Sequence, residues 1–305
     1  MSKWVSFSTG EGSRVGLVDG DDVLALAGDE DILGVLGDLE SAEGRVGSER
    51  FSLADVQILP TVPHPPSVRD FMAFEQHVRT GFEYMGFDVP QQFYELPVFY
   101  FTNPRALVGA RDSVPVPPGS ELFDFELEVA AVIGKEGSDL APTEAEEHIA
   151  GYSIFVDWSA RDVQANEMTM RLGPAKSKDT ASTLGPFLVT PDELEPHRSG
   201  KGFDLGMRVY VNGSLYGSDV WANIHWSFGE MLSYASRGTT LSVGDVVGSG
   251  TCGMGCLIEI RYRKTEDDYP FLVPGDVVRV EIDGLGATEN TIVEGVPYVD
   301  HRLPA

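Results

Sequence analysis

The sequence has few basic residues and lacks a long apolar run. Its 305 residues include 22 Lys and Arg against 48 Asp and Glu, a net charge of −26. Because nucleic-acid binding needs a basic stripe that neutralises phosphates, this balance excludes nucleic acid as a partner. No apolar stretch approaches the roughly 18 residues of a membrane span, and the start MSKWVSFSTGEGSRVG lacks the apolar core of a secretory signal. We therefore expect a cytoplasmic protein with no membrane partner.

Cysteine is also scarce. Cys252 and Cys256 are the only two, and both stand in the stretch GTCGMGC. A structural zinc site of the common kind needs a second pair of ligands, so one isolated pair excludes it. A cytosolic chain also keeps its thiols reduced. We interpret both cysteines as small packing residues in a glycine-rich turn and expect no redox role for them.

Short patterns at the beginning of the chain predict a small β module. Hydrophobic residues make up 42% and aromatic residues 10% of the sequence, which is typical of a folded protein. Residues 3–8, 14–18 and 22–27 are strand patterns separated by Gly and Asp turns. The proline-rich stretch LPTVPHPPSVRD then disfavours regular structure. We place a domain boundary there, with an N-terminal β domain and linker at 1–65 and a larger catalytic domain at 66–305.

The larger part has many strand patterns and few helical ones. We expect strands at 97–101, 123–134, 151–159, 185–190, 206–213, 245–250, 256–262 and 276–282. We expect helices at 141–150, 160–168 and 227–237. This order favours a β-rich α+β fold with short helices at its edges over a regular alternation of parallel strands and helices.

The stretch FDFELEVAAVIG, residues 123–134, carries two glutamates into an apolar run. Strand side chains alternate between faces, so Glu126 and Glu128 share one face. A solvated polar side of a half-buried strand would explain the pattern by itself. Yet Ala130 and Val132 continue the same face, as expected where a strand runs from a cleft into a core covered on both sides. Two carboxylates at such a mouth repel each other unless a cation lies between them, which favours a metal site.

Further polar residues stand near the ends of apolar runs. Asp157 ends one such run, where it either caps the following helix or supplies a third carboxylate ligand. Three carboxylates suit Mg²⁺ or Mn²⁺, with Ca²⁺ as a further candidate, whereas zinc prefers histidine or thiolate. Two of the chain's six lysines, Lys176 and Lys178, fall in GPAKSKDTASTLGPF. They are either a solvated loop pair or a group that holds an anionic oxygen beside the metal.

Asp70 and His77 stand in the stretch VRDFMAFEQHVRTGF, seven residues apart. On a helix these two side chains would share one face, two turns apart. A lone histidine is more often structural than catalytic, so this spacing alone assigns His77 no role.

Taken in order, FELE, DWSARDVQ, KSKDT with LGP, and LSVGDVVGSGT resemble the fumarylacetoacetate hydrolase family over roughly residues 66 to 300. The resemblance implies a mixed β-roll for the C-terminal domain, a homodimer, and a divalent metal held by carboxylates. Its lysine pattern, K-x-x-D/G-T, fits Lys176 better than Lys178. The implied metal ligands are Glu126, Glu128, Asp157 and Asp70; the implied catalytic residues are His77, Glu259 and Lys176; the implied substrate-binding residues are Arg161, Gln164, Thr180, Thr251 and Tyr100.

The resemblance also implies a reaction on a small keto-acid substrate. The leading hypothesis is metal-dependent hydrolysis of the C–C bond of an acylpyruvate or related β-diketone acid, in which the metal stabilises the departing enolate. His77 would take a proton from water and Glu259 would stabilise the resulting imidazolium. The alternatives at the same site are decarboxylation of an oxaloacetate-like acid and isomerisation or hydration of an enol acid. A non-catalytic metal-binding module is disfavoured, because it would need carboxylates but no base.

Overall fold

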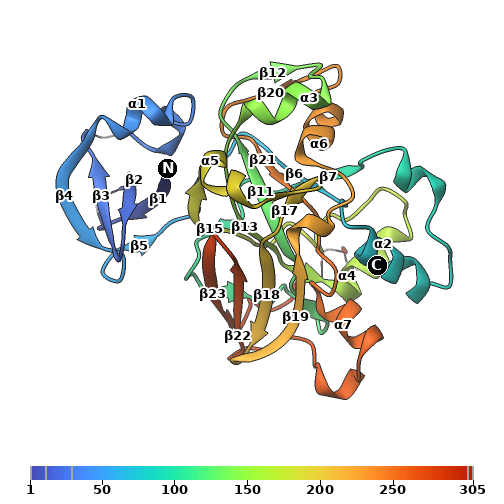
Figure 1. The fold of residues 1–305 in the computed structure, drawn as a ribbon. Coiled ribbons are helices and arrows are strands. Elements are labelled where there is room, and N and C mark those ends of the chain that lie inside the picture. Colours follow the sequence, from blue (N-terminus) through green and yellow to red (C-terminus); the bar gives the residue numbers. More distant parts are fainter. Residues whose placement is uncertain (1, 11, 29, 301, 304–305) are drawn as a thin grey trace.

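A computed structural model describes residues 2–10, 12–28, 30–300 and 302–303 of the chain. Figure 1 shows the N-terminal strands, in blue, to one side of a larger β-rich body that carries short helices at its edges. The expected β-rich α+β class is confirmed. No helix within the described ranges is long and apolar enough to cross a bilayer.

The largest sheet has 12 strands and runs through both parts of the chain. β1 pairs antiparallel with β15, so the N-terminal strands extend the sheet of the larger part. In spatial order its members are β4 (Val46–Ser52), β3 (Asp22–Leu26), β2 (Arg14–Asp19), β1 (Lys3–Ser8), β15 (Ser182–Val189), β13 (Ile149–Asp157), β11 (Leu127–Ile133), β21 (Val246–Gly248), β6 (Val68–Phe71) and β7 (Phe99–Thr102), with β5 (Gln57–Ile58) beside β1 and β8 (Leu107–Val108) beside β15.

A second sheet of five strands packs on one face of the first, in the order β19 (Ser214–Val220), β18 (Gly206–Val211), β22 (Val277–Ile282), β23 (Gly286–Val293), β9 (Val114–Pro115). Leu127 and Val129 of β11 belong to the core between the sheets. Ala130 and Val132, on the other face of β11, pack with Trp4 of the N-terminal module. As the alternation predicts, this strand is covered on both faces. Three small pairs complete the strands: β10 (Phe123–Asp124) with β14 (Ser159–Ala160), β12 (Gly137–Ser138) with β20 (Thr240–Leu241), and β16 (Arg198–Ser199) with β17 (Gly202–Phe203).

The helices are short. They are α1 (Leu39–Glu43), α2 (Glu75–Tyr84), α3 (Pro142–Ala145), α4 (Arg161–Met168), α5 (Pro191–Leu194), α6 (Phe228–Ala235) and α7 (Leu257–Arg263), with 3₁₀ turns at Ile32–Gly34, Gln91–Tyr94, Glu146–His148, Glu195–His197, Trp221–Asn223 and Glu266–Asp268. The expected helices are confirmed at α4 and at α6, where Ser227 and Glu230 form a capping box. The one expected at 141–150 is shorter, since a 3₁₀ turn and then β13 follow α3.

Three local predictions are wrong. The segment 256–262 is the helix α7 and not a strand, because its apolar residues at positions 257 and 260 are spaced for one buried helix face. Asp70 lies in β6 and His77 in α2, so they do not share a helix. The segment 123–134 is two strands, β10 and β11, since the chain at Glu126 leaves the sheet and makes an isolated bridge to Cys256.

Candidate active site

Four buried carboxylates from separate strands gather at one place. Asp70 belongs to β6, Glu128 to β11 and Asp157 to the end of β13, while Glu126 directly precedes β11. One oxygen of each lies within 4.8 Å of the others. All four residues are buried, with at most 6% of the residue surface exposed. The structure thus brings together the four residues that the sequence predicts as metal ligands.

The strand order explains this gathering. β21 lies between β11 and β6, and Gly248 of β21 pairs with both Ala130 and Asp70. A Cβ atom at Gly248 would stand 2.6 Å from Asp70 Oδ1 and 3.1 Å from Glu128 Oε2. Only glycine at this position lets carboxylates from the two flanking strands approach each other.

Three oxygens of the cluster have no partner. Asp70 Oδ1, Glu128 Oε1 and Asp157 Oδ1 are buried without any hydrogen bond. A buried carboxylate oxygen without a partner is costly, and three of them within a few ångströms fit a hard divalent cation. The donor set consists of oxygen atoms alone, which suits Mg²⁺, Mn²⁺ or Ca²⁺ and not zinc.

The titration behaviour of the cluster follows from burial and its charges. Burial raises the pKa of Asp70 to about 6 and that of Asp157 to about 7, and it raises the pKa of Glu128 well above its usual value. Burial acts on Glu126 in the same direction, but the charges of Lys178 and Arg161 outweigh it, so the pKa of Glu126 lies below its usual value. A bound cation would favour the ionised form of every member.

Mn²⁺ is expected to raise the unfolding temperature of the protein, because a ligand at 100 times its Kd stabilises the folded state by about 2.7 kcal/mol. Glu128→Gln should weaken Mn²⁺ binding at least about tenfold, since it replaces a ligand oxygen that bears charge with an amide. Glu136→Gln is the matched control, because Glu136 is exposed. Mn²⁺ titration followed by electron paramagnetic resonance measures the Mn²⁺ affinity of both variants. Equal affinities in the two variants would contradict the assignment.

Lys178, and not Lys176, reaches the carboxylates. Lys178 Nζ lies 2.6 Å from Glu126 Oε2 and 2.5 Å from Asp157 Oδ2, and its side chain is 4% exposed. Lys176 is 72% exposed and pairs with Asp179. The prediction that Lys176 stands at the catalytic site is therefore wrong, and Lys178 occupies that place. Burial acts to lower the pKa of Lys178, but Asp157 and Glu126 hold it above its usual value, so the ammonium stays charged.

Tyr100 also reaches the cluster. It stands opposite Asp70 in the pairing of β6 with β7. Its hydroxyl lies 2.6 Å from Asp157 Oδ2 and 3.1 Å from Asp70 Oδ2. Burial and the charge of Asp157 raise its pKa well above the usual value, so the phenol keeps its proton and donates it to a carboxylate.

The remaining predicted substrate-binding residues are Arg161, Gln164, Thr251 and Thr180. Arg161 is buried, with Nη2 at 2.8 Å from Glu126 Oε1, and its Nη1 donates to Gln164 Oε1 at 3.0 Å. Thr251 is buried in the turn after β21. Thr180 has a buried hydroxyl without a hydrogen-bond partner, so its Oγ1 is available to a ligand group. Substrate binding by these residues stays a prediction.

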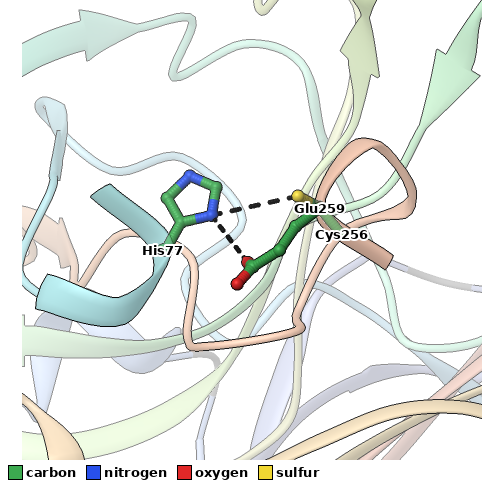
Figure 2. Close-up of side chains that lie close together, drawn as sticks. All are labelled: His77, Cys256 and Glu259. Carbon is green, nitrogen blue, oxygen red and sulfur yellow. Dashed lines mark hydrogen bonds and ion pairs between the residues drawn. The ribbon is translucent and has the colours of Figure 1, made fainter. Parts of the chain in front are cut away.

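A histidine–glutamate pair stands beside the carboxylates. His77 Nδ1, on α2, lies 3.1 Å from Glu259 Oε2, on α7 (Figure 2). Thr80 Oγ1 lies 3.1 Å from the other oxygen of Glu259. Burial acts to raise the pKa of Glu259, but the contact with His77 lowers it below its usual value, so Glu259 is ionised. With Nδ1–H donating to this carboxylate, Nε2 carries the free lone pair and is the basic nitrogen.

The two halves of the site are close in space. Cys256 makes a backbone bridge with Glu126 of the carboxylate cluster. Cys256 Sγ lies 3.9 Å from His77 Nδ1. Figure 2 shows the thiol and the imidazole side by side. Both cysteines are free and buried, and burial raises their thiol pKa values well above the usual range. A base, an ionised partner and a cation-binding cluster together suit proton transfer at a carbon beside a carbonyl.

Sequence reasoning preferred Lys176 to Lys178 and gave no role to Asp124, although Lys178 and Asp124 are both buried in this region. Lys178 stands two residues after Lys176, so the sequence offered both lysines as candidates, but the family pattern favoured Lys176. Asp124 stands two residues before Glu126 and continues its spacing, which is the signal that could have found it. His225 packs against Phe93 and Trp226, with ring centroids 5.1 Å apart in each case. This aromatic packing agrees with a structural role.

Two family profiles match this chain. A family profile described as "Fumarylacetoacetate (FAA) hydrolase C-terminal" matches residues 67–293. The chain belongs to the fumarylacetoacetate hydrolase family. A second profile, "Rv2993c-like, N-terminal", matches residues 2–60. The predicted family and fold are confirmed.

The names of similar proteins refer to more than one activity. "Oxaloacetate tautomerase fahd2, mitochondrial" of Xenopus laevis is 36% identical over 199 residues, which are 65% of this chain and 58% of that protein. The chain thus spans less than two thirds of that relative's length. "Oxaloacetate tautomerase YisK" of Bacillus subtilis is 30% identical over 252 residues, 81% of this chain and 76% of that protein. The solved "Fumarylacetoacetate hydrolase (EaFAH)" of Exiguobacterium antarcticum is 26% identical, covers 97% of this chain and 100% of its own, and has a TM-score of 0.75.

Proposed function

We propose that this protein is a divalent-metal-dependent enzyme that enolises a small β-keto acid, and that its reaction is the keto–enol tautomerisation of an oxaloacetate-like diacid. The observation that carries the proposal is the His77–Glu259 pair beside three buried carboxylate oxygens without partners. The identity to two oxaloacetate tautomerases supports the choice of substrate. This reaction belongs to the enol-acid isomerases that the sequence left as an alternative.

Asp70, Glu126, Glu128 and Asp157 would hold the cation. When bound, it supplies the positive charge that stabilises an enolate. His77 Nε2 takes the proton from the carbon between the two carbonyl groups, and the same proton returns to the carbonyl oxygen to give the enol. Glu259 accepts the Nδ1 hydrogen bond and stabilises the imidazolium between these two steps.

Two further residues favour an anionic substrate in this site. Lys178 adds a buried ammonium group next to Glu126 and Asp157, and Arg161 adds a guanidinium on the other side of Glu126. Both cations offset the charge of the carboxylates, so an incoming dianion meets less repulsion.

Hydrolysis of an acylpyruvate is the second candidate. The same His77–Glu259 pair could activate water, and a fumarylacetoacetate hydrolase structure covers 97% of this chain. Decarboxylation of oxaloacetate needs the cation but no base. The His77–Glu259 pair therefore supports decarboxylation less than it supports tautomerisation or hydrolysis.

One assay with three readouts separates these reactions. Oxaloacetate is supplied with Mn²⁺, and the ultraviolet absorbance of its enol is followed. Pyruvate formation is measured in the same tube through a coupled dehydrogenase, and an acylpyruvate is tested in parallel. We expect the enol absorbance to reach equilibrium faster than in buffer with Mn²⁺ alone, without pyruvate formation. Pyruvate release would support the decarboxylase, cleavage of the acylpyruvate alone would support the hydrolase, and no change in any readout would contradict the proposal.

We also propose that the protein is a homodimer, as the family resemblance implies. Phe87 and Phe101 are 66% and 62% exposed, and large apolar side chains at that exposure are common where a second subunit packs. Light scattering should give twice the 33.1 kDa mass of the chain. A mass near 33.1 kDa at working concentration would contradict the dimer.

A further inference from the structure

Asp124 of β10 is fully buried and bonds to the beginning of α7. Its Oδ1 accepts hydrogen bonds from the backbone N–H groups of Phe125 and Leu257, both at 2.7 Å. Its Oδ2 accepts from Ile258 N–H at 3.2 Å. The first backbone N–H groups of a helix have no partner within the helix, and no side chain of a neighbouring residue caps α7. Asp124, more than 130 positions away in sequence, provides the cap.

The same carboxylate is joined to the cation-binding cluster. Arg161 Nε donates to Asp124 Oδ2 at 2.8 Å, and Nη2 of the same guanidinium lies 2.8 Å from Glu126 Oε1. Arg161 is 8% exposed, so the pairing takes place away from water. One rigid guanidinium thus links a capping carboxylate to a proposed metal ligand.

Helix α7 carries the other half of the site. Glu259 is its third residue and holds His77 Nδ1 at 3.1 Å. Cys256, immediately before the helix, also makes the backbone bridge with Glu126. The path from Glu126 through Arg161 and Asp124 to α7 is therefore continuous, and every link is a hydrogen bond or ion pair between buried groups.

We infer that Asp124 is a positioning residue that couples the cation-binding carboxylates to the His77–Glu259 pair. Asp124 already accepts hydrogen bonds from the N–H groups of Leu257 and Ile258. A cation on Glu126 would weaken the pairing of Glu126 with Arg161, so the guanidinium would pair more closely with Asp124 and fix this cap. The base is thereby held most firmly when the cation is in place. This inference rests on the proposed metal-dependent function and deepens it, because it names how the metal half and the base half act together.

Hydrogen exchange of backbone amides tests the coupling without substrate. In the wild-type protein, Mn²⁺ should slow exchange in peptides that cover α7 by about threefold or more relative to peptides that cover α6. Asp124→Asn keeps an oxygen for Leu257 N–H but cannot form the ion pair with Arg161. In this variant the extra protection of α7 should be lost, although Mn²⁺ still binds.

Asp245→Asn is the matched control. Asp245 is 2% exposed, pairs with Arg69 at 3.2 Å and accepts a hydrogen bond from the Ser242 N–H, so it combines the same kinds of contact as Asp124. Loss of a buried aspartate–arginine pair should lower the stability of both variants. Only Asp124→Asn should remove the response of α7 to Mn²⁺.

The outcomes are separable. If Mn²⁺ binds the wild-type protein and α7 shows no extra protection, or if Asp124→Asn keeps that protection, the inference is overturned while the proposed reaction stands. If the wild-type protein does not bind Mn²⁺, both fail. If Asp124→Asn does not fold, Arg161→Lys gives the same test, because lysine cannot bridge Asp124 and Glu126 with one planar group. If Arg161→Lys keeps the extra protection of α7, the inference is overturned. If it loses that protection, the inference is supported.

Discussion

Replacing His77 with Ala is expected to lower turnover of oxaloacetate by about 10²-fold or more while Mn²⁺ affinity stays within about twofold of wild type. His77 pairs with Glu259, a carboxylate that lies outside the cation-binding cluster. Removing the imidazole takes away the group that would carry the proton between carbon and oxygen. The substitution removes no proposed cation ligand, so turnover should fall while Mn²⁺ affinity is kept.

The measurement is kcat for enol formation at saturating Mn²⁺, together with Mn²⁺ titration of each protein. His64→Ala is the control, since His64 is exposed in the proline-rich linker and should leave both quantities unchanged. Glu259→Gln should act in the same direction as His77→Ala but more weakly, because it removes only the group that orients and charges the base. Near wild-type kcat in His77→Ala would remove His77 from the mechanism.

Replacing Lys178 with Met is expected to destabilise the metal-free protein by about 3–5 kcal/mol, because it takes one partner from a buried ion pair. Glu126 and Asp157 would then lose the ammonium that lies 2.6 and 2.5 Å from their oxygens. Methionine has a similar length and keeps the packing of the stem, so the loss reports the charge. The free energy of unfolding, measured in urea after removal of metal by a chelator, tests this.

Lys176→Met is the matched control two residues away. Its ammonium is 72% exposed, so the substitution should change stability by less than about 0.5 kcal/mol. Turnover should divide the two lysines in the same way, with a large loss only in Lys178→Met. A large loss of stability and turnover in Lys176→Met, with little change in Lys178→Met, would restore the lysine that the family pattern favours.

Local sequence patterns predicted a large part of the fold. The alternation of apolar residues predicted β1, β2, β3, β13, β18 and β22, and the capped apolar pattern at 227–237 predicted α6, because these segments have the period and end signals of their structure. The family could also be identified from sequence, since four short motifs in a fixed order are specific even though each motif is weak. The spacing of Glu126 and Glu128 predicted that both face one side. Both do belong to the carboxylate cluster, although Glu126 lies just outside β11.

Tertiary structure decided the rest, because each remaining point depends on contacts between segments far apart in sequence. Residues 256–262 fit both the alternation of a strand and the spacing of a helix. In the structure they form α7, whose first N–H groups are capped by Asp124. Lys176 and Lys178 have the same charge and nearly the same position in the chain, and only the course of the loop turns Lys178 into the carboxylate cluster.

By itself the sequence determined the family, the β-rich class and a set of carboxylates that could hold a cation, since these depend on residue types and local spacing. It could not show that Gly248 lets Asp70 approach Glu128, or that His77 and Glu259 meet from two different helices. Those contacts arise when β21 inserts between β11 and β6 and when α2 packs beside α7. Strand order and helix packing minimise the free energy of the whole chain, so no short stretch of sequence specifies them.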